Sequence, residues 1–233
     1  MIYFTADTHF GHANIIKYCD RPFASVEEMD ATLIANWNSV VPKHADVYHL
    51  GDFAWTGRNR DRNRQASLIN DYASALNGNI HLVVGNHDNR AACEMSDAFD
   101  WVDILTEIKY AKQNIVLCHY AMRTWNKSHF GSWQLYGHTH GTMPEYEDMR
   151  SLDVGVDSCQ YHPISYENVL KEMKTRVFPD KNQFQTLFDN MKKNSLGQPD
   201  CPNCENGGIP DISGGILKYK LCETCEGTGK LPT

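Results

Sequence analysis

The sequence has no long apolar segment and no excess of positive charge. Its 233 residues carry 22 Lys and Arg against 29 Asp and Glu, a formal net charge of −7. A protein that wraps DNA or RNA needs a basic face, so this balance argues against a nucleic-acid coat. It does not exclude a nucleotide substrate, because bound metal ions can reverse the local field. The longest apolar run, near residues 80–84, has the length of a strand rather than the roughly 18 residues of a membrane helix.

The N-terminal residues lack the features of a secretory signal. Residues 1–6 are mostly apolar, but no basic segment precedes them, and Asp7 and His9 follow at once. A signal peptide needs a longer apolar stretch and a cleavage site. We therefore predict a cytoplasmic protein that makes no membrane contact. In a reducing cytosol its eight cysteines should be thiols or metal ligands rather than disulfides.

Short apolar runs that end in polar, histidine-rich turns dominate the first 140 residues. Five runs of this kind are expected to be buried strands with their turns, at residues 2–9, 46–52, 79–88, 114–120 and 133–140. Helical patterns lie between and after them, at residues 26–37, 64–76 and 166–175, and Ser25 with Glu28 resembles a capping box. The alternation predicts an α/β fold whose polar turns gather at the carboxyl edge of a sheet, where such folds bind ligands.

The polar residues in these turns are of the types that bind transition metals. They are Asp7, His9, Asp52, Asn86, His119, His138 and His140. Seven ligands are more than one ion needs, and the mixture of Asp, Asn and His favours Mn, Fe, Zn or Ni over calcium, which takes oxygen ligands only. A carboxylate that bridges two ions about 3.5–4 Å apart is used for in-line displacement at phosphorus.

The motifs DTH, GD, GNHD, a lone His119 and GHTH, taken in this order, closely resemble those of the calcineurin-like metallophosphoesterases over roughly residues 1–175. The resemblance implies two packed mixed β-sheets flanked by helices. It also implies two metal ions that share Asp52 as a bridge. One ion would be held by Asp7, His9, Asp52 and His140, and the other by Asp52, Asn86, His119 and His138. His87 would be the acid that assists the leaving group, positioned by Asp88.

These residues predict a phosphoesterase that depends on two divalent metal ions. A hydroxide that bridges the metals would attack phosphorus in line, while His87 assists the leaving group. A phosphodiester is the preferred substrate. Two alternatives stay open: a phosphomonoesterase or nucleotidase, and a noncatalytic metal-binding scaffold with a zinc-ribbon interaction module. The scaffold is disfavoured because metal ligation alone does not need His87.

Several residues beside the motifs are candidates for contact with substrate. His12, Asn14 and Arg123 could touch it, and ordinary loop roles are the alternative for each. A nucleotide or short oligonucleotide would suit the arginines at positions 58, 60, 62 and 64 and the tryptophans at positions 55 and 125. The competing interpretation is a solvated loop for the arginines and core packing for the tryptophans.

The composition changes after residue 175. Residues 176–196 are predicted to be a linker that contains an amphipathic helix, and residues 197–233 a small tail. Two CxxC pairs in the tail favour one structural zinc ion, bound by Cys201, Cys204, Cys222 and Cys225. A redox pair is the alternative. The pair at residues 222–225 resembles the CxxCxGxG repeat of DnaJ-type chaperones. Three roles stay open for this zinc ribbon: a contact with another protein, a dimer contact, or a cover over the active site.

Overall fold

The computed structural model describes residues 1–57, 61–144, 149–176, 208–211 and 218–221. The chain divides into two compact units, Met1–Phe178 and Pro179–Thr233. In the second unit the described residues form one antiparallel strand pair, β10 (Gly208–Asp211) and β11 (Lys218–Leu221). The predicted amphipathic helix and the four cysteines of the predicted zinc ribbon lie outside the described residues, so both stay predictions.

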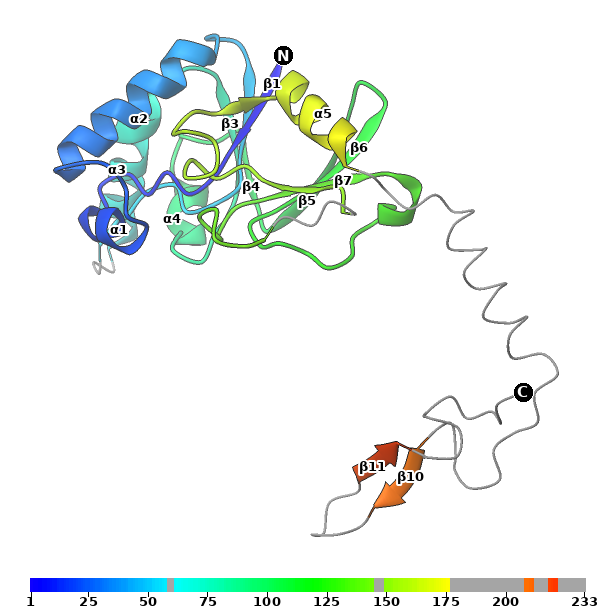
Figure 1. Cartoon of the computed structure of the whole chain (residues 1–233). Helices are drawn as coiled ribbons and strands as arrows, with labels where there is room; N and C mark the ends of the chain where they lie inside the picture. Colours follow the sequence, from blue (N-terminus) through cyan, green and yellow to red (C-terminus); the bar gives the residue numbers. More distant parts are fainter. Residues whose placement is uncertain (58–60, 145–148, 177–207, 212–217, 222–233) are drawn as a thin grey trace. The chain divides into compact units, whose positions relative to one another are not determined.

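The first sheet carries three of the predicted motifs at one edge. Its strand order is β4-β3-β2-β1-β9. Strands β1, β3 and β4 of this sheet are labelled in Figure 1. The strands are β1 (Ile2–Thr5), β2 (Asp46–His49), β3 (Asn79–Val83), β4 (Trp101–Asp103) and β9 (Ile164–Ser165). Strands β1 to β4 are parallel, and β9 is antiparallel to β1. The turns after β1, β2 and β3 therefore meet, and these turns contain DTH, GD and GNHD.

The second sheet carries the remaining two motifs. Its order is β5-β6-β7-β8, with strands β5 (Leu105–Tyr110), β6 (Gln113–Cys118), β7 (Trp133–Tyr136) and β8 (Ser151–Asp153). Strands β6, β7 and β8 are parallel, and β5 pairs with β6 as an antiparallel hairpin. His119 follows β6 and GHTH follows β7. Both sheets are mixed, so the predicted α/β fold of two mixed sheets is confirmed.

Three of the described helices begin near the residues that the sequence indicates: α2 (Val26–Val40), α3 (Arg62–Ser74) and α5 (Tyr166–Thr175). The sequence patterns did not predict α1 (Ala13–Tyr18), α4 (Arg90–Met95) or a 3-10 turn at Ser128–Phe130. Ser25 accepts a hydrogen bond from the backbone N–H of Glu28 at 3.2 Å, which is why α2 begins at Val26. The segment between Asn86 and His119 holds more than the one strand–helix–strand unit that its length indicates, because β4 and β5 both lie within it.

Two apolar layers hold the first unit together. One layer packs helical side chains such as Met29, Leu33 and Trp37 against one face of the first sheet. The other layer lies between the sheets and contains Phe4 of the first sheet and Leu117 of the second, with side chains of α5. The second layer holds the two sheets face to face, which brings their motif-bearing edges to one place. Within the described part of the chain, no helix has the length and apolar character needed to cross a membrane.

Candidate metal centre

Most of the candidate ligands adopt the left-handed backbone conformation, which directs their side chains back over the sheet edges. Five of the seven have positive φ values between 48° and 70°: Asp7, His9, Asp52, His138 and His140. This conformation is uncommon outside glycine, although Asp and His adopt it more often than most residues. The glycines before the motifs allow a close approach. A Cβ on Gly85 would lie 2.2 Å from Asp52 Oδ1, and one on Gly137 would lie 2.5 Å from Asp7 Oδ2.

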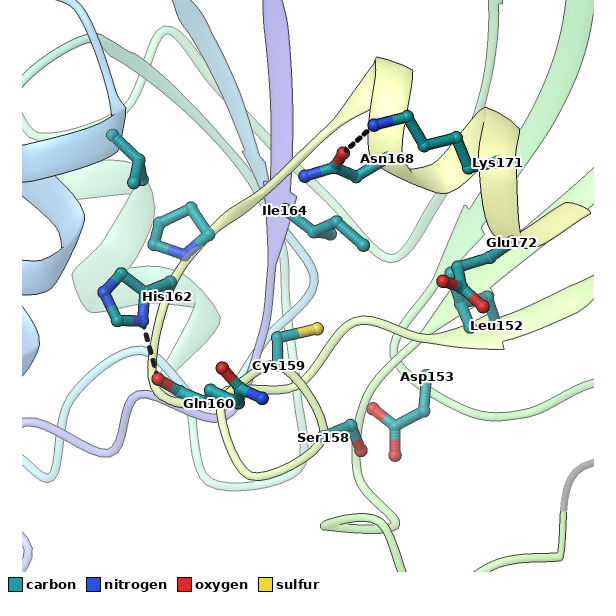
Figure 2. Close-up of a pocket in the computed structure, with 12 residues that line it drawn as sticks. Leu152, Asp153, Ser158, Cys159, Gln160, His162, Ile164, Asn168, Lys171 and Glu172 are labelled. Atoms are coloured by element: carbon teal, nitrogen blue, oxygen red, sulfur yellow. Dashed lines mark hydrogen bonds between the residues drawn. The ribbon is translucent and has the colours of Figure 1, made fainter.

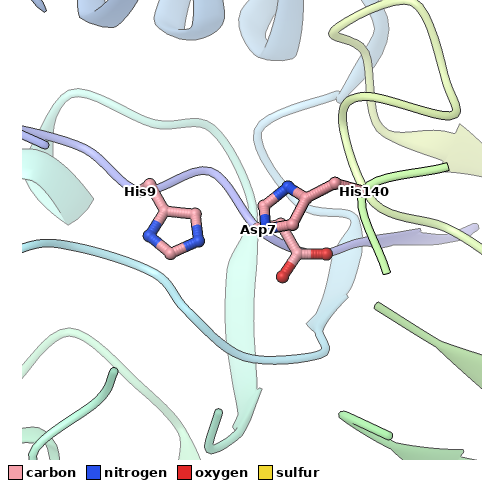
Figure 3. Close-up of side chains that lie close together, drawn as sticks. All are labelled: Asp7, His9 and His140. Atoms are coloured by element: carbon pink, nitrogen blue, oxygen red, sulfur yellow. The ribbon is translucent and has the colours of Figure 1, made fainter. Parts of the chain in front are cut away.

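The first ligand cluster consists of Asp7, His9 and His140 (Figure 3). Their ligand atoms lie within 4.8 Å of one another, and Asp7 and His9 are 0% and 1% exposed. Asp7 Oδ2 accepts a hydrogen bond from the His138 backbone N–H at 2.8 Å. By contrast, Asp7 Oδ1 and His9 Nε2 are buried without a hydrogen-bond partner. Buried polar atoms are rarely left in this state, and a divalent cation would satisfy both.

The second ligand cluster consists of Asp52, His119 and His138, whose ligand atoms also lie within 4.8 Å of one another. His119 donates from Nδ1 to the Leu50 carbonyl at 2.7 Å, so its Nε2 is left to face the cluster. This Nε2 lies 3.0 Å from Asn86 Oδ1. Asp52 and His119 are buried, whereas Asn86 and His138 are exposed.

Asp52 lies between the two clusters. Its Oδ1 accepts a hydrogen bond from the His87 backbone N–H at 2.8 Å. Its Oδ2 is 3.5 Å from His9 Nε2 on one side and 3.5 Å from His119 Nε2 on the other. A carboxylate oxygen in this position can face ions held by either cluster, as a bridging ligand must.

Burial shifts the pKa values of several ionisable groups in the two clusters toward their uncharged forms. Burial, with the neighbouring carboxylates of Asp52 and Asp153, raises the pKa of Asp7 well above its usual range. Burial also raises the pKa of Asp52. It lowers the pKa of His119 to about 4 and that of His9 further. The imidazoles of His9 and His119 are thus neutral, which is the form that binds metals, and divalent ions would stabilise the two carboxylates.

The expected catalytic pair, His87 and Asp88, is arranged differently from the sequence expectation. The His87 side chain is exposed, with its ring centroid 5.4 Å from that of His9. Asp88 was expected to position this ring. Instead, its carboxylate accepts hydrogen bonds from the backbone N–H groups of Asp52 at 2.7 Å, Phe53 at 2.9 Å and Gly85 at 2.8 Å. A half-buried carboxylate needs several donors, and these turns supply three. Asp88 therefore holds the turn after β2 and the turn after β3 together.

The three candidates for substrate contact lie in different surroundings. His12 is buried, with Nδ1 3.4 Å from His9 Nδ1, and its ring stacks on Trp55 at a centroid distance of 4.5 Å. It therefore contacts His9 at Nδ1, the ring nitrogen opposite Nε2. Asn14 is exposed in the first turn of α1, and Arg123 is exposed in the loop after β6.

Two aromatic side chains of the loop after β6 have opposite exposures. Trp125 is buried and donates from Nε1 to the Ser132 carbonyl, as core packing requires. Tyr120 is 48% exposed, and its ring meets those of His138 and His119 edge-on at centroid distances of 4.8 and 5.0 Å. The sequence reasoning missed Tyr120, and its position directly after His119 was the available signal.

Arg21 and Asp157 are two further residues at the site that sequence reasoning missed. The Arg21 guanidinium binds both carboxylate oxygens of Asp157 at 2.8 Å, and Asp157 Oδ2 accepts a hydrogen bond from His140 Nδ1 at 2.6 Å. Burial acts to raise the pKa of Asp157, but the hydrogen bonds from His140 and Arg21 outweigh it and lower that pKa overall. The two residues are 136 positions apart in the sequence, and no motif spacing links them.

A separate pocket of about 540 Å³ lies beside strand β8 and helix α5 (Figure 2). Its described lining includes Asp153 and Lys171 but none of the seven candidate ligands. Asp153 also accepts hydrogen bonds from Thr139 Oγ1 at 2.6 Å and from the Gly141 N–H at 3.2 Å. The same carboxylate therefore lines this pocket and holds the GHTH turn in place.

A sandwich of two mixed sheets with candidate metal ligands gathered at one edge is the arrangement expected of a metal-dependent phosphoesterase. Residues 1–155 match the sequence profile of the calcineurin-like phosphoesterases, and the chain belongs to this family.

Two proteins and one solved structure show the likeness in detail. The chain is 35% identical over 175 residues to an uncharacterised protein of Methanocaldococcus jannaschii, a match that covers 73% of this chain and 89% of that protein. It is 29% identical over 185 residues to the Gene 66 protein of Mycobacterium phage L5, covering 67% and 86%. The crystal structure of a protein of unknown function from Aquifex aeolicus is similar with a TM-score of 0.57 and 26% identity. That match covers 74% of this chain and 98% of the Aquifex chain.

Proposed function

We propose that this chain is a phosphodiesterase that uses two divalent metal ions. The position of Asp52 carries the proposal, because its Oδ2 lies 3.5 Å from a ligand nitrogen of each cluster. Two clusters that share one carboxylate suit a pair of ions about 3.5–4 Å apart. Asp7, His9 and His140 would hold one ion with Asp52, and Asn86, His119 and His138 would hold the other with Asp52. The mixed nitrogen and oxygen donors suit Mn, Fe, Zn or Ni.

The metal ions, His87 and Asp88 would have separate roles in the reaction. When bound, the ions supply positive charge to the phosphate oxygens and lower the pKa of water, so that it can attack at neutral pH. His87 projects from the turn after β3 on the exposed side of the site, and its backbone N–H is fixed to Asp52 Oδ1. An imidazole so placed can donate a proton to the leaving oxygen. Asp88 keeps His87 in place by fastening the turns that carry it and Asp52.

Exposure favours a diester over a monoester. Asn86, His87 and His138 are all exposed, so the site is open on the side where the second organic group of a diester would project. Tyr120 borders this open side and offers a flat apolar surface. A short oligonucleotide or another nucleotide-type diester has an organic group on each side of the phosphorus, whereas a monoester such as a mononucleotide has only one. We therefore place nucleotide-type diesters first and monoesters second.

Hydrolysis of paired model substrates tests the proposal. The purified full chain, stripped with a chelator, is assayed with an aryl phosphodiester and the matching aryl phosphomonoester, each with and without added Mn²⁺. We expect metal-dependent turnover, with the diester hydrolysed faster. The Asp52→Asn variant should lose most of this turnover. Asp71→Asn, on the exposed face of α3, is its matched control and should retain full activity. If neither substrate is hydrolysed with any added metal, the enzyme proposal is wrong. If the monoester is the faster substrate, the diester assignment is wrong.

A further inference from the structure

We propose that Arg21 is a positioning residue for the metal ion of the first cluster, acting through Asp157 on His140. The inference rests on the two-metal centre proposed above, but it concerns how firmly each ion is held rather than the reaction. It predicts that the two metal positions depend on different parts of the chain. One position would need Arg21 and Asp157, and the other would not.

Arg21 is buried, with a side chain that is 0% exposed, and its hydrogen bonds converge on one small region. Nε and Nη2 bind the two carboxylate oxygens of Asp157 at 2.8 Å each. Nη2 also donates to the Asp7 carbonyl at 2.7 Å, and Nη1 donates to the Thr8 carbonyl at 3.2 Å. One guanidinium therefore holds the backbone of the DTH turn and a carboxylate from a distant segment at the same time.

Asp157 passes this constraint on to a candidate ligand. Its Oδ2 accepts a hydrogen bond from His140 Nδ1 at 2.6 Å, which turns the opposite ring nitrogen toward Asp7 and His9. A carboxylate behind a ligating histidine fixes the ring's tautomer and direction. Arg21 thus connects a turn of the first sheet, which supplies Asp7, with a turn of the second sheet, which supplies His140.

The second cluster is held by other means. His119 is fixed by the Leu50 carbonyl, and Asp52 by the backbone N–H of His87. Asp88 then fastens the turns around Asp52. Disturbing Arg21 should therefore affect the two positions unequally. A lysine at position 21 would keep the charge, but a single ammonium cannot present the planar fork that binds both oxygens of Asp157.

The experiment measures metal binding by the full chain without any assay of turnover. Metal-free wild type, Arg21→Lys and Asp157→Asn are titrated with Mn²⁺ and followed by calorimetry and by electron paramagnetic resonance, which separates magnetically coupled ion pairs from single ions. We expect the wild type to form coupled pairs. In both variants one binding step should weaken by about 10–100-fold, the range for changes in the outer partners that orient a ligating histidine, with single-ion signals replacing pairs. Arg90→Lys, an exposed arginine paired with Glu94, is the matched control and should bind as the wild type does.

Each other result counts against the inference. Pairs that form with unchanged affinity in both variants would overturn the role of Arg21 and leave the proposed metal centre intact. Equal weakening of both steps, together with a lower melting temperature of the metal-free variants, would reduce Arg21 to a general structural residue. A wild type that binds no Mn²⁺ pair would overturn the proposed two-metal centre itself, and this inference with it. Asp157→Asn changes little in size, so it keeps the test valid if Arg21→Lys does not fold.

Discussion

The two halves of the candidate metal centre are built to different degrees of closure. In the closed half, formed by Asp7, His9 and His140, two side chains are buried and the third is fixed by Asp157. In the open half, formed by Asn86, His119 and His138, only His119 is buried. Burial with fixed partners restricts side-chain motion before an ion binds, while exposure leaves room for an incoming group. We infer that the closed half retains its ion more firmly and that substrate approaches over the open half.

Loss of the ligand that the halves share should have the largest effect. Asp52→Asn removes the charge from the one oxygen that faces both clusters, so both ions should bind more weakly and turnover should fall by about 10³-fold. Metal content and diester hydrolysis, measured on the same preparation, check this. If Asp52→Asn loses one ion and keeps most of its activity, the two halves do not share Asp52 in the way the geometry indicates.

Removal of His87 should separate chemistry from metal binding. His87→Asn keeps the backbone N–H that donates to Asp52 but removes the imidazole, so we expect diester turnover to fall by about 10²-fold with metal content unchanged. The loss should be smaller for a substrate with a very acidic leaving group, which needs less protonation. Equal losses for good and poor leaving groups would argue against His87 as the proton donor.

Acid should destabilise the metal-free protein through a histidine beneath the closed half. His49 accepts a hydrogen bond from the Gly51 N–H on Nδ1, and its Nε2 is 2.9 Å from Thr8 Oγ1, which itself donates to the Phe53 carbonyl. The ring is therefore neutral, and burial, with nearby His119, lowers its pKa to about 3. The unfolded chain, with a histidine pKa near 6.5, binds the proton more readily. Stability contributed by His49 is thus present above about pH 6.5 and is lost as the pH falls toward 3.

Denaturant unfolding between pH 7 and pH 4 measures this contribution. The His49→Gln variant should be less stable than the wild type at pH 7, and its stability should change less with pH across this interval. His44→Gln, at an exposed position, is the control and should follow the wild-type curve. Parallel curves for the wild type and His49→Gln would place the acid sensitivity elsewhere.

The smallest expected effect concerns the border of the open half. Tyr120→Leu removes an exposed ring that meets His138 and His119 edge-on. We expect this ring to contact the aryl group of a bound diester as well. An aromatic contact contributes about 0.5–1.5 kcal/mol, so KM for an aryl diester should rise by roughly 2–10-fold, with kcat nearly unchanged. Hydrolysis of a dialkyl diester is the comparison, and there KM should not change. A matching rise for the dialkyl substrate would mean that Tyr120 does not contact the aryl group of the diester.

The sequence predicted the parts of this molecule that depend on local pattern. Apolar runs that end in Asp or His marked the strand ends, and the Ser25 cap marked the start of α2. Parallel strands then bring such ends together whatever the loops contain, so the seven candidate ligands could be grouped in advance. Contacts that depend on distant segments could not be foreseen. Arg21 meets Asp157 because the two sheets pack, and Asp88 binds backbone N–H groups that carry no sequence signal.

The left-handed backbone conformation of the candidate ligands would affect the outcome of a selection for thermal stability. A residue other than glycine costs about 1–2 kcal/mol in this conformation, and Asp7, His9, Asp52, His138 and His140 all adopt it. Glycine at the exposed position, His138, would relieve the backbone while it removed a ligand. A screen that rewards thermal stability in metal-free medium would therefore enrich inactive chains. The same screen run with metal present should retain the ligands, because binding to the folded state then adds to its stability.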